Sequence, residues 1–178
     1  MIRDFSIHAK PASHKAKAVF TALMLTAAAV VVVSMLLESY RGVVGMIGMF
    51  IVVAATWIYT RHIASDYYYD LITYSDDEPT LVVRQIIGKR QSTLSRVCLA
   101  DVVSAEMEDA ATRRAHKTAQ GTRKYFYTPT MFPERTCRLT VESRYERSEI
   151  IIEISDEICA LIREFSDEAR ELRALAEE

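Results

Sequence analysis

The sequence predicts a membrane α-hairpin joined to an α+β domain: two transmembrane helices, then a seven-stranded antiparallel barrel capped by a C-terminal helix. Two apolar runs without charged residues, at 18–37 and 42–60, are separated by only four residues. After residue 65, several segments alternate apolar and polar side chains, which is the period of a half-buried strand. These observations predict a basic tail at 1–17, a hairpin at 18–60 and a polar domain at 65–178.

Each apolar run is long enough to cross a membrane. The runs contain 20 and 19 residues, and a helix rises about 1.5 Å per residue, so each covers a hydrocarbon layer of about 30 Å. The short connection at 38–41 makes the two helices antiparallel neighbours. The first run is longer than the apolar region of a signal peptide, and bulky residues stand where a cleavage site would need small ones. We therefore expect both helices to be retained, as in a multi-pass membrane protein.

The charges predict the orientation of this hairpin. The net charge of −2 combines +4 for residues 1–64 with −6 for residues 65–178. Basic residues flank the outer ends of both runs, whereas the connection carries only Arg41, offset by Glu38. The positive-inside rule therefore places both termini in the cytoplasm. An acidic domain is poorly suited to nonspecific nucleic-acid binding, which requires phosphate neutralisation, so no nucleic-acid partner is expected.

Aromatic and basic side chains mark the expected membrane interfaces. Trp57, Tyr59 and Arg61 lie near the cytoplasmic end of the second run, and Tyr40 lies at the other end. Neither run contains Asp, Glu, Lys, Arg or His, which argues against an ion pathway. Glycines recur every third residue at positions 42, 45 and 48. This spacing is compatible with packing inside the hairpin or with a seam for an oligomer.

Seven segments of the polar domain have strand character. They are residues 67–74, 80–87, 91–99, 102–107, 124–128, 136–142 and 148–154. The alternation is clearest in the sixth, where Cys137, Leu139 and Val141 point one way and the intervening polar residues the other. Short turns join most neighbours, which favours antiparallel pairing, but residues 108–123 form a longer polar connection without strand pattern.

The C-terminal segment has helical spacing. Its apolar residues recur at intervals of three, four or seven; they are Ile158, Leu161, Ile162, Phe165, Leu172 and Leu175. Ser155 is a plausible N-cap, and Asp156 and Glu157 suit the positive end of the helix dipole. One apolar stripe of this kind would close the open end of a barrel.

The order of these elements resembles bacterial membrane proteins in which a two-helix hairpin precedes a pleckstrin-homology-like domain. The resemblance covers residues 18–175 and is carried, besides the hairpin, by Tyr67-Tyr68-Tyr69, Leu81-Val82-Val83-Arg84, Gly88-Lys89-Arg90, Leu99-Ala100-Asp101-Val102 and the helix beginning at Asp156-Glu157. It implies a location in the bacterial inner membrane and a fold that serves lipid binding, peptide binding or scaffolding. Members that bind phosphoinositides carry basic residues on the first strand pair and its loop. The acidic Asp76-Asp77-Glu78 stands there instead and argues against that activity.

The residues that usually carry catalysis are absent or dispersed. The four histidines do not show the spacing of a zinc hydrolase, and the sequence lacks a phosphate-binding glycine loop and a serine-nucleophile motif. The three cysteines Cys98, Cys137 and Cys159 are expected to be free thiols in a cytoplasmic domain. No enzyme activity, cofactor or metal is therefore expected.

Two binding surfaces remain as candidates. One is a locally basic segment with five candidate lipid contacts: Arg113, Arg114, Lys117, Arg123 and Lys124. It is either a solvated loop or a contact for anionic headgroups. The other is the exposed sheet edge and groove beside the C-terminal helix, where the resemblance implies that extended peptides bind by strand addition. The favoured function is non-enzymatic binding of an unidentified protein partner, or of further copies of the chain, at the membrane; the alternative is binding or sensing of anionic lipid.

Overall fold

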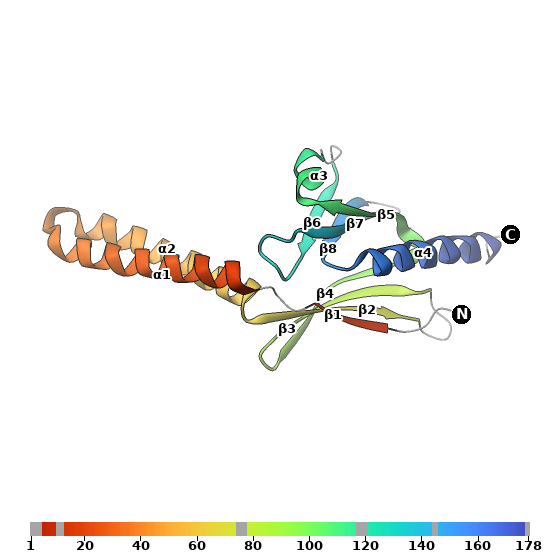
Figure 1. Ribbon diagram of the computed structural model, residues 1–178, viewed down its shortest axis with the longest axis horizontal. Helices are drawn as coiled ribbons and strands as arrows, with labels where there is room; N and C mark the ends of the chain where they lie inside the picture. The colour runs from red at the N-terminus through yellow and green to blue at the C-terminus, as the bar shows by residue number, and fades with distance from the viewer. Residues whose placement is uncertain (1–4, 10–12, 74–77, 117–120, 144–145, 177–178) are drawn as a thin grey trace. The chain divides into compact units, whose positions relative to one another are not determined.

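The computed structural model describes residues 5–9, 13–73, 78–116, 121–143 and 146–176. The chain forms two compact units, one of Pro11–Ser65 and one of Met1–Lys10 with Asp66–Glu178. Figure 1 shows the helical hairpin of the first and the sheets of the second.

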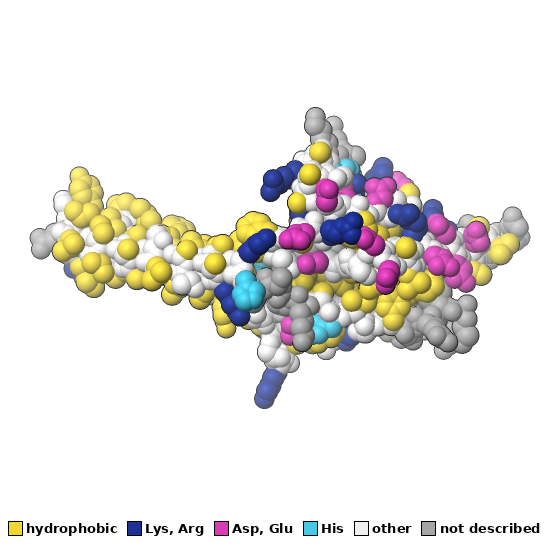
Figure 2. Space-filling view, viewed as in Figure 1, with side chains coloured by type: hydrophobic (Ala, Val, Ile, Leu, Met, Phe, Trp, Pro, Cys, Tyr) yellow, Lys and Arg dark blue, Asp and Glu magenta, His cyan; other side chains and the backbone are white. Residues whose placement is uncertain are grey.

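The first unit is the helical hairpin that the sequence predicts. It consists of α1 (Ser13–Leu36), the short helix η1 (Glu38–Tyr40) and α2 (Arg41–His62). A Cβ added at Gly48 would lie 3.3 Å from Cγ1 of Val30, so this glycine allows the helices to approach closely, whereas a Cβ at Gly42 or Gly45 would meet nothing within 4 Å. Close packing inside the hairpin therefore accounts for one of the three glycines. The remaining surface of the pair is largely apolar (Figure 2).

The expected basic tail contains a strand. Residues Phe5–Ala9 form β1, which pairs antiparallel with β2 (Ser65–Ile72), with Ala9 opposite Tyr67. Phe5, Ile7 and Ala9 alternate with polar residues and pack against the core. The segment before the hairpin thus completes a sheet of the domain that follows it, and Lys15 and Lys17 belong to α1 rather than to a tail.

The strands form two four-stranded sheets rather than the expected seven-stranded antiparallel barrel. Sheet A has the order β1-β2-β3-β4, with β3 at Thr80–Ile87 and β4 at Arg90–Cys98. Sheet B has the order β5-β7-β8-β6. Its strands are β5 (Val102–Asp109), β6 (Arg123–Tyr127), β7 (Arg135–Ser143) and β8 (Glu146–Ile152), preceded by the short helix η2 (Leu99–Asp101).

All seven segments with strand character are strands, but one runs in an unexpected direction. β6 pairs parallel with β8. A parallel neighbour needs a crossover connection. The chain supplies this crossover through β7, which lies between β6 and β8 in the sequence, whereas the polar connection leads from β5 to β6 and contains a short helix, α3 (Ala110–Ala115). The barrel prediction is wrong because strand pattern does not encode the direction of an edge strand.

One core joins the sheets and α4 (Asp156–Ala176). Its fully buried side chains include Tyr69, Leu81, Leu139, Ile152 and Ile162. The predicted helix is confirmed. The amide of Ile158 donates to the side chain of Ser155 at 3.4 Å, as expected of an N-cap. The predicted stripe is too long, however, because Leu172 and Leu175 are 56% and 69% exposed.

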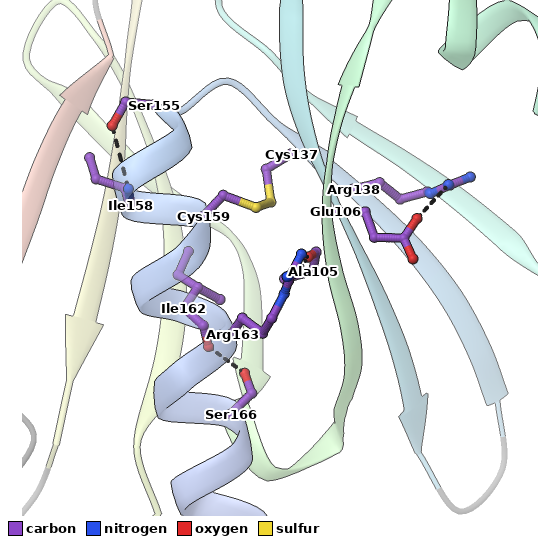
Figure 3. The surroundings of a disulfide bond; sticks show 10 residues. All are labelled: Ala105, Glu106, Cys137, Arg138, Ser155, Ile158, Cys159, Ile162, Arg163 and Ser166. Atoms are coloured by element: carbon purple, nitrogen blue, oxygen red, sulfur yellow. Dashed lines mark hydrogen bonds and ion pairs between the residues drawn. A yellow bond between two sulfur atoms is a disulfide. The ribbon is translucent and has the colours of Figure 1, made fainter.

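A disulfide joins α4 to sheet B. Cys159 on the helix is bonded to Cys137 on β7, with their Cα atoms 6.1 Å apart (Figure 3). One turn further on, Nε of Arg163 donates to the carbonyl of Ala105 on β5 at 3.0 Å. The expectation of three free thiols is therefore wrong, and Cys98 is the one free cysteine in the described chain. The spacing of two cysteines on different elements does not reveal that the fold brings them together.

Candidate functional site

The basic segment is divided between α3 and β6. Arg113 and Arg114 lie in the last turn of α3, Arg123 and Lys124 begin β6, and Lys117 falls outside the described residues. α3 is held in place at both ends. The carboxylate of Asp109 accepts a hydrogen bond from the amide of Thr112 at 2.7 Å, which caps the helix.

Arg113 attaches the end of α3 to sheet B. Its Nη1 donates to the hydroxyl of Thr136 on β7 at 2.9 Å, and its Nη2 donates to the carbonyl of Pro133 at 2.8 Å. Thr136 is fully buried. This arginine therefore has a structural role inside the domain.

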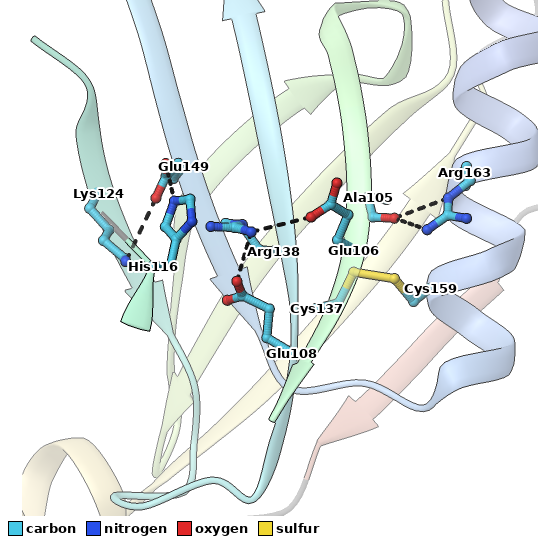
Figure 4. A network of polar contacts seen from close by, with 10 residues as sticks. All are labelled: Ala105, Glu106, Glu108, His116, Lys124, Cys137, Arg138, Glu149, Cys159 and Arg163. Carbon is cyan, nitrogen blue, oxygen red and sulfur yellow. Dashed lines mark hydrogen bonds and ion pairs between the residues drawn. A yellow bond between two sulfur atoms is a disulfide. The ribbon is translucent and has the colours of Figure 1, made fainter. Parts of the chain in front are cut away.

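Beside it, a network of ion pairs covers the outer face of sheet B (Figure 4). Nη2 of Arg138 lies 2.7 Å from Oε1 of Glu108 and 3.2 Å from Oε2 of Glu106. Nε2 of His116, at the end of α3, lies 3.1 Å from Oε1 of Glu149, and Nζ of Lys124 lies 3.6 Å from the other oxygen of that carboxylate. Both β5 and β6 are thus tied to the central strands by charge.

Three members of this network are buried. The side chains of Glu108, Glu149 and Arg138 are 1%, 7% and 9% exposed. The contact between Arg138 and Glu108 is an ion pair by distance but is poorly aligned for a hydrogen bond, and Nη1 of Arg138 has no hydrogen-bond partner among the described residues. Such a pair contributes little net stability while intact, but loss of one partner leaves an uncompensated buried charge.

The electrostatics of Glu149 follow from its neighbours. Burial alone would raise the pKa of Glu149, but the hydrogen bond with His116 and the nearby positive charges outweigh it, so the pKa lies below its ordinary value. The carboxylate is therefore ionised at neutral pH and helps to hold α3 on the sheet.

The four described candidates for lipid contact, Arg113, Arg114, Arg123 and Lys124, do not form one free patch. Arg113 and Lys124 are engaged inside the domain, and Nε of Arg123 lies 3.1 Å from Oε1 of Glu146. Arg114 is exposed, and its side chain makes no ion pair or hydrogen bond in the part of the chain that the structure describes. Two of these positive charges, on Arg123 and Lys124, are thus paired with acidic residues distant in sequence.

The expected interface anchors lie at the two ends of the hairpin. Trp57 and Tyr59 of α2 are 55% and 44% exposed, and the guanidinium of Arg61 lies over the Trp57 ring at 5.3 Å from its centroid. Tyr40, in η1 at the other end, is 66% exposed. This distribution of exposed aromatic rings is typical of a helix pair with an interface at each end.

A second candidate site is the region where the edge strands β4 and β6 approach each other. The hydroxyl of Tyr127 on β6 donates to the carbonyl of Leu94 on β4 at 3.5 Å. Its ring stacks on that of Tyr125, with centroids 6.2 Å apart. Deeper in the core, the hydroxyl of Tyr69 donates to the carbonyl of Tyr127 at 2.6 Å. Beyond the Tyr127 contact, residues 90–93 of β4 are exposed.

The remaining reactive groups are structural. Burial and a hydrogen bond to Glu78 raise the pKa of Cys98 to about 11, so this cysteine is a thiol at neutral pH and a poor nucleophile. Hydrogen bonds from Arg173 and Cys98 lower the pKa of Glu78 to about 2. Arg173 also contacts Asp101 at 2.8 Å, so this cluster attaches α4 to the start of β3 and to η2. Within the described ranges, no group of three His, Cys, Asp or Glu side chains is placed to hold a metal ion.

Comparisons with known proteins find no relative of this chain: no family model matches, and neither the curated proteins nor the solved structures give a match.

Proposed function

We propose that this chain is a membrane-anchored, non-enzymatic binding module. Its hairpin spans the bilayer, and its β-domain binds an extended segment of a protein, either an unidentified partner or a further copy of the chain. Membrane anchoring is supported by α1 and α2, which are long and apolar enough to cross a membrane; only 11% and 17% of their most apolar windows are buried. The core helix of a soluble protein would bury most of such a surface.

The pairing of β1 with β2 supports an even number of crossings. β1 precedes the hairpin and β2 follows it, and the two strands are hydrogen-bonded neighbours. They must therefore lie on the same side of any membrane that the helices cross. Two crossings by α1 and α2 satisfy this requirement.

The outer edge of β4, to which no other described strand pairs, is the observation that carries the proposed binding activity. β4 is the terminal strand of sheet A and pairs with β3 along its length. An edge strand presents unpaired backbone groups to which another strand can add. The stacked Tyr125 and Tyr127 beside it offer aromatic surface to the side chains of such a strand.

The side of the membrane on which the β-domain and both termini lie is proposed from the distribution of charged residues. Basic residues around the outer ends of both helices favour the cytoplasm for both termini, in the bacterial inner membrane if the resemblance holds. The disulfide favours the opposite assignment, since disulfides persist chiefly in oxidising compartments. Thiol labelling separates these assignments directly.

Crosslinking at the edge of β4 tests the binding proposal. Ile87 and Arg90 flank a two-residue turn, so we expect them to form a hydrogen-bonded pair and the next residue, Gln91, to direct its N–H away from β3. A photo-reactive residue at Thr93 should give a defined crosslinked product in cells, and Gln91→Pro should abolish it without breaking the β3–β4 ladder.

A photo-reactive residue at the exposed Arg147 on β8 is the control. The same product from Arg147, or a product unaffected by Gln91→Pro, would exclude the β4 edge as the binding surface.

The alternative, binding of anionic lipid through residues 113–124, has weaker support. Its favourable observation is the exposed Arg114. The other described candidates already have partners inside the domain.

A further inference from the structure

The β3–β4 turn lies at the end of sheet A where the chain arrives from α2. Only Ile63 and Ala64 separate the end of α2 from the start of β2. Side-chain contacts show that β3 runs back toward this point. Arg84 contacts Asp70 and lies over the Tyr68 ring, whereas the next residue, Gln85, reaches the hydroxyl of Tyr67 at 3.2 Å. Ile87 is therefore level with the start of β2, and the β3–β4 turn that follows Ile87 lies at this end of sheet A (Figure 1).

This turn carries an apolar side chain and two free cations. Ile87 is 39% exposed, and Gly88, Lys89 and Arg90 are exposed as well. Gly88 has a φ of 60°, while the described residues other than glycine all have negative φ. These dihedrals are typical of a type II′ turn, a tight connection with a defined shape. The side chains of Lys89 and Arg90 make no ion pair or hydrogen bond in the part of the chain that the structure describes.

The turn differs in this respect from the basic segment at 113–124. There most cations are paired with carboxylates or carbonyls of the domain. At the turn, two adjacent cations project from a domain whose net charge is −6. An anionic surface would therefore attract this end of sheet A and repel most of the remainder.

We propose that the β3–β4 turn, residues Ile87–Arg90, docks on anionic lipid headgroups of the membrane that the hairpin spans. The inference rests on the proposed anchoring and adds to it a lipid class and a membrane-facing end of the domain. The three Cα–Cα steps from His62 to Ser65 cover at most about 11 Å, so the start of β2 stays close to the bilayer surface. The turn lies at the same end of sheet A, and charges interact over a range of about 10 Å at moderate salt. Ile87 would enter the headgroup layer while Lys89 and Arg90 pair with phosphates.

Spin labelling of the full-length chain tests this proposal. The label is placed at Gln91→Cys in a Cys98→Ser background, and the protein is inserted into nanodiscs of phosphatidylcholine, with or without phosphatidylglycerol. In anionic nanodiscs we expect the label to lose mobility and its accessibility to a water-soluble nickel chelate to fall by at least about twofold, because two cations beside anionic headgroups favour the docked state. Lys89→Ser with Arg90→Ser should remove this difference between the two lipids.

A matched control separates the turn from the 113–124 segment. Arg114→Ser with Arg123→Ser removes the same charge from two exposed arginines and should leave the lipid dependence intact. A label that behaves identically in both lipids, or a lipid dependence abolished by the control pair rather than by the turn pair, would overturn the proposal. Failure of the chain to insert into nanodiscs would instead contradict the anchoring on which it rests.

Discussion

At the residue scale, Arg138 has the least expected environment. Alternation along β7 assigns Leu139 to the core and Arg138 to the opposite, solvated face. The arginine does lie on that opposite face, but it is only 7% exposed and faces Glu106 and Glu108. Alternation predicts on which face of a sheet a side chain lies and does not predict what covers that face.

Removal of Arg138 alone should be costly. Arg138→Met leaves Glu108 buried and without its counter-charge, so the free energy of unfolding should fall by about 3–5 kcal/mol. Glu108→Leu in the same chain should recover most of the loss, because it removes the stranded charge. Denaturant unfolding in detergent measures both effects. If the double variant were as unstable as Arg138→Met alone, the loss of free energy of unfolding would not arise from the unpaired carboxylate of Glu108.

The lowered pKa of Glu149 predicts a dependence of stability on pH. A carboxyl group whose pKa is lower in the folded state stabilises the fold above its ordinary pKa of 4.5, and this contribution is lost as the pH falls through the folded value. Glu149→Gln should therefore lower the thermal midpoint at neutral pH and have a progressively smaller effect below about pH 4.5. The exposed Glu142→Gln is the control and should change little at either pH. A deficit for Glu149→Gln that stays constant down to about pH 3 would contradict the role given to its charge.

At the scale of elements, the sequence predicts what depends on local periodicity and misses what depends on distant partners. The helices, the strand positions and the cap at Ser155 all follow from spacing over a few residues. The direction of β6 and the bond between Cys137 and Cys159 depend on segments far apart in the chain. β1 had a local signal, the alternation of Phe5, Ile7 and Ala9, but its partner strand lies beyond the whole hairpin.

The dependence on partners distant in sequence also explains why the environment of the basic segment could not be predicted. The five basic residues were recognisable from composition. Their partners, Glu146, Glu149 and Thr136, come from strands that follow them in the chain. The sequence predicts a turn at Gly88-Lys89-Arg90. That this turn lies at the end of sheet A where β2 begins follows only from the order of the strands.

The disulfide predicts how firmly α4 is held. Cys137→Ser with Cys159→Ser should lower the free energy of unfolding of the oxidised protein by about 2–4 kcal/mol, because the bond closes a loop between residues 22 apart. A reductant should destabilise the unmodified chain by a similar amount and leave the double variant unchanged. Cys98→Ser, which removes the free thiol, is the control and should retain the response to reductant. A chain that purifies with three titratable thiols and is indifferent to reductant would contradict the covalent attachment.

At the scale of the whole molecule, the proposed membrane topology depends on the order of β1, the hairpin and β2 along the chain. A strand from before the hairpin pairs with a strand from after it, so both segments must lie on the same side of any membrane that α1 and α2 cross. The domain is then attached to the helices through two short connections rather than one. Such a double connection would restrict the domain more than a single tether.

Labelling of single cysteines from one side of the membrane tests this account most directly. In intact cells, an impermeant thiol reagent should label Ser39→Cys in η1 but not Gln91→Cys on β4, each in a Cys98→Ser background. After permeabilisation both positions should react. Labelling of Gln91→Cys alone in intact cells would keep the two crossings and reverse the side assigned from charge. Equal labelling of the two positions in intact cells would contradict the central claim that the hairpin spans the membrane.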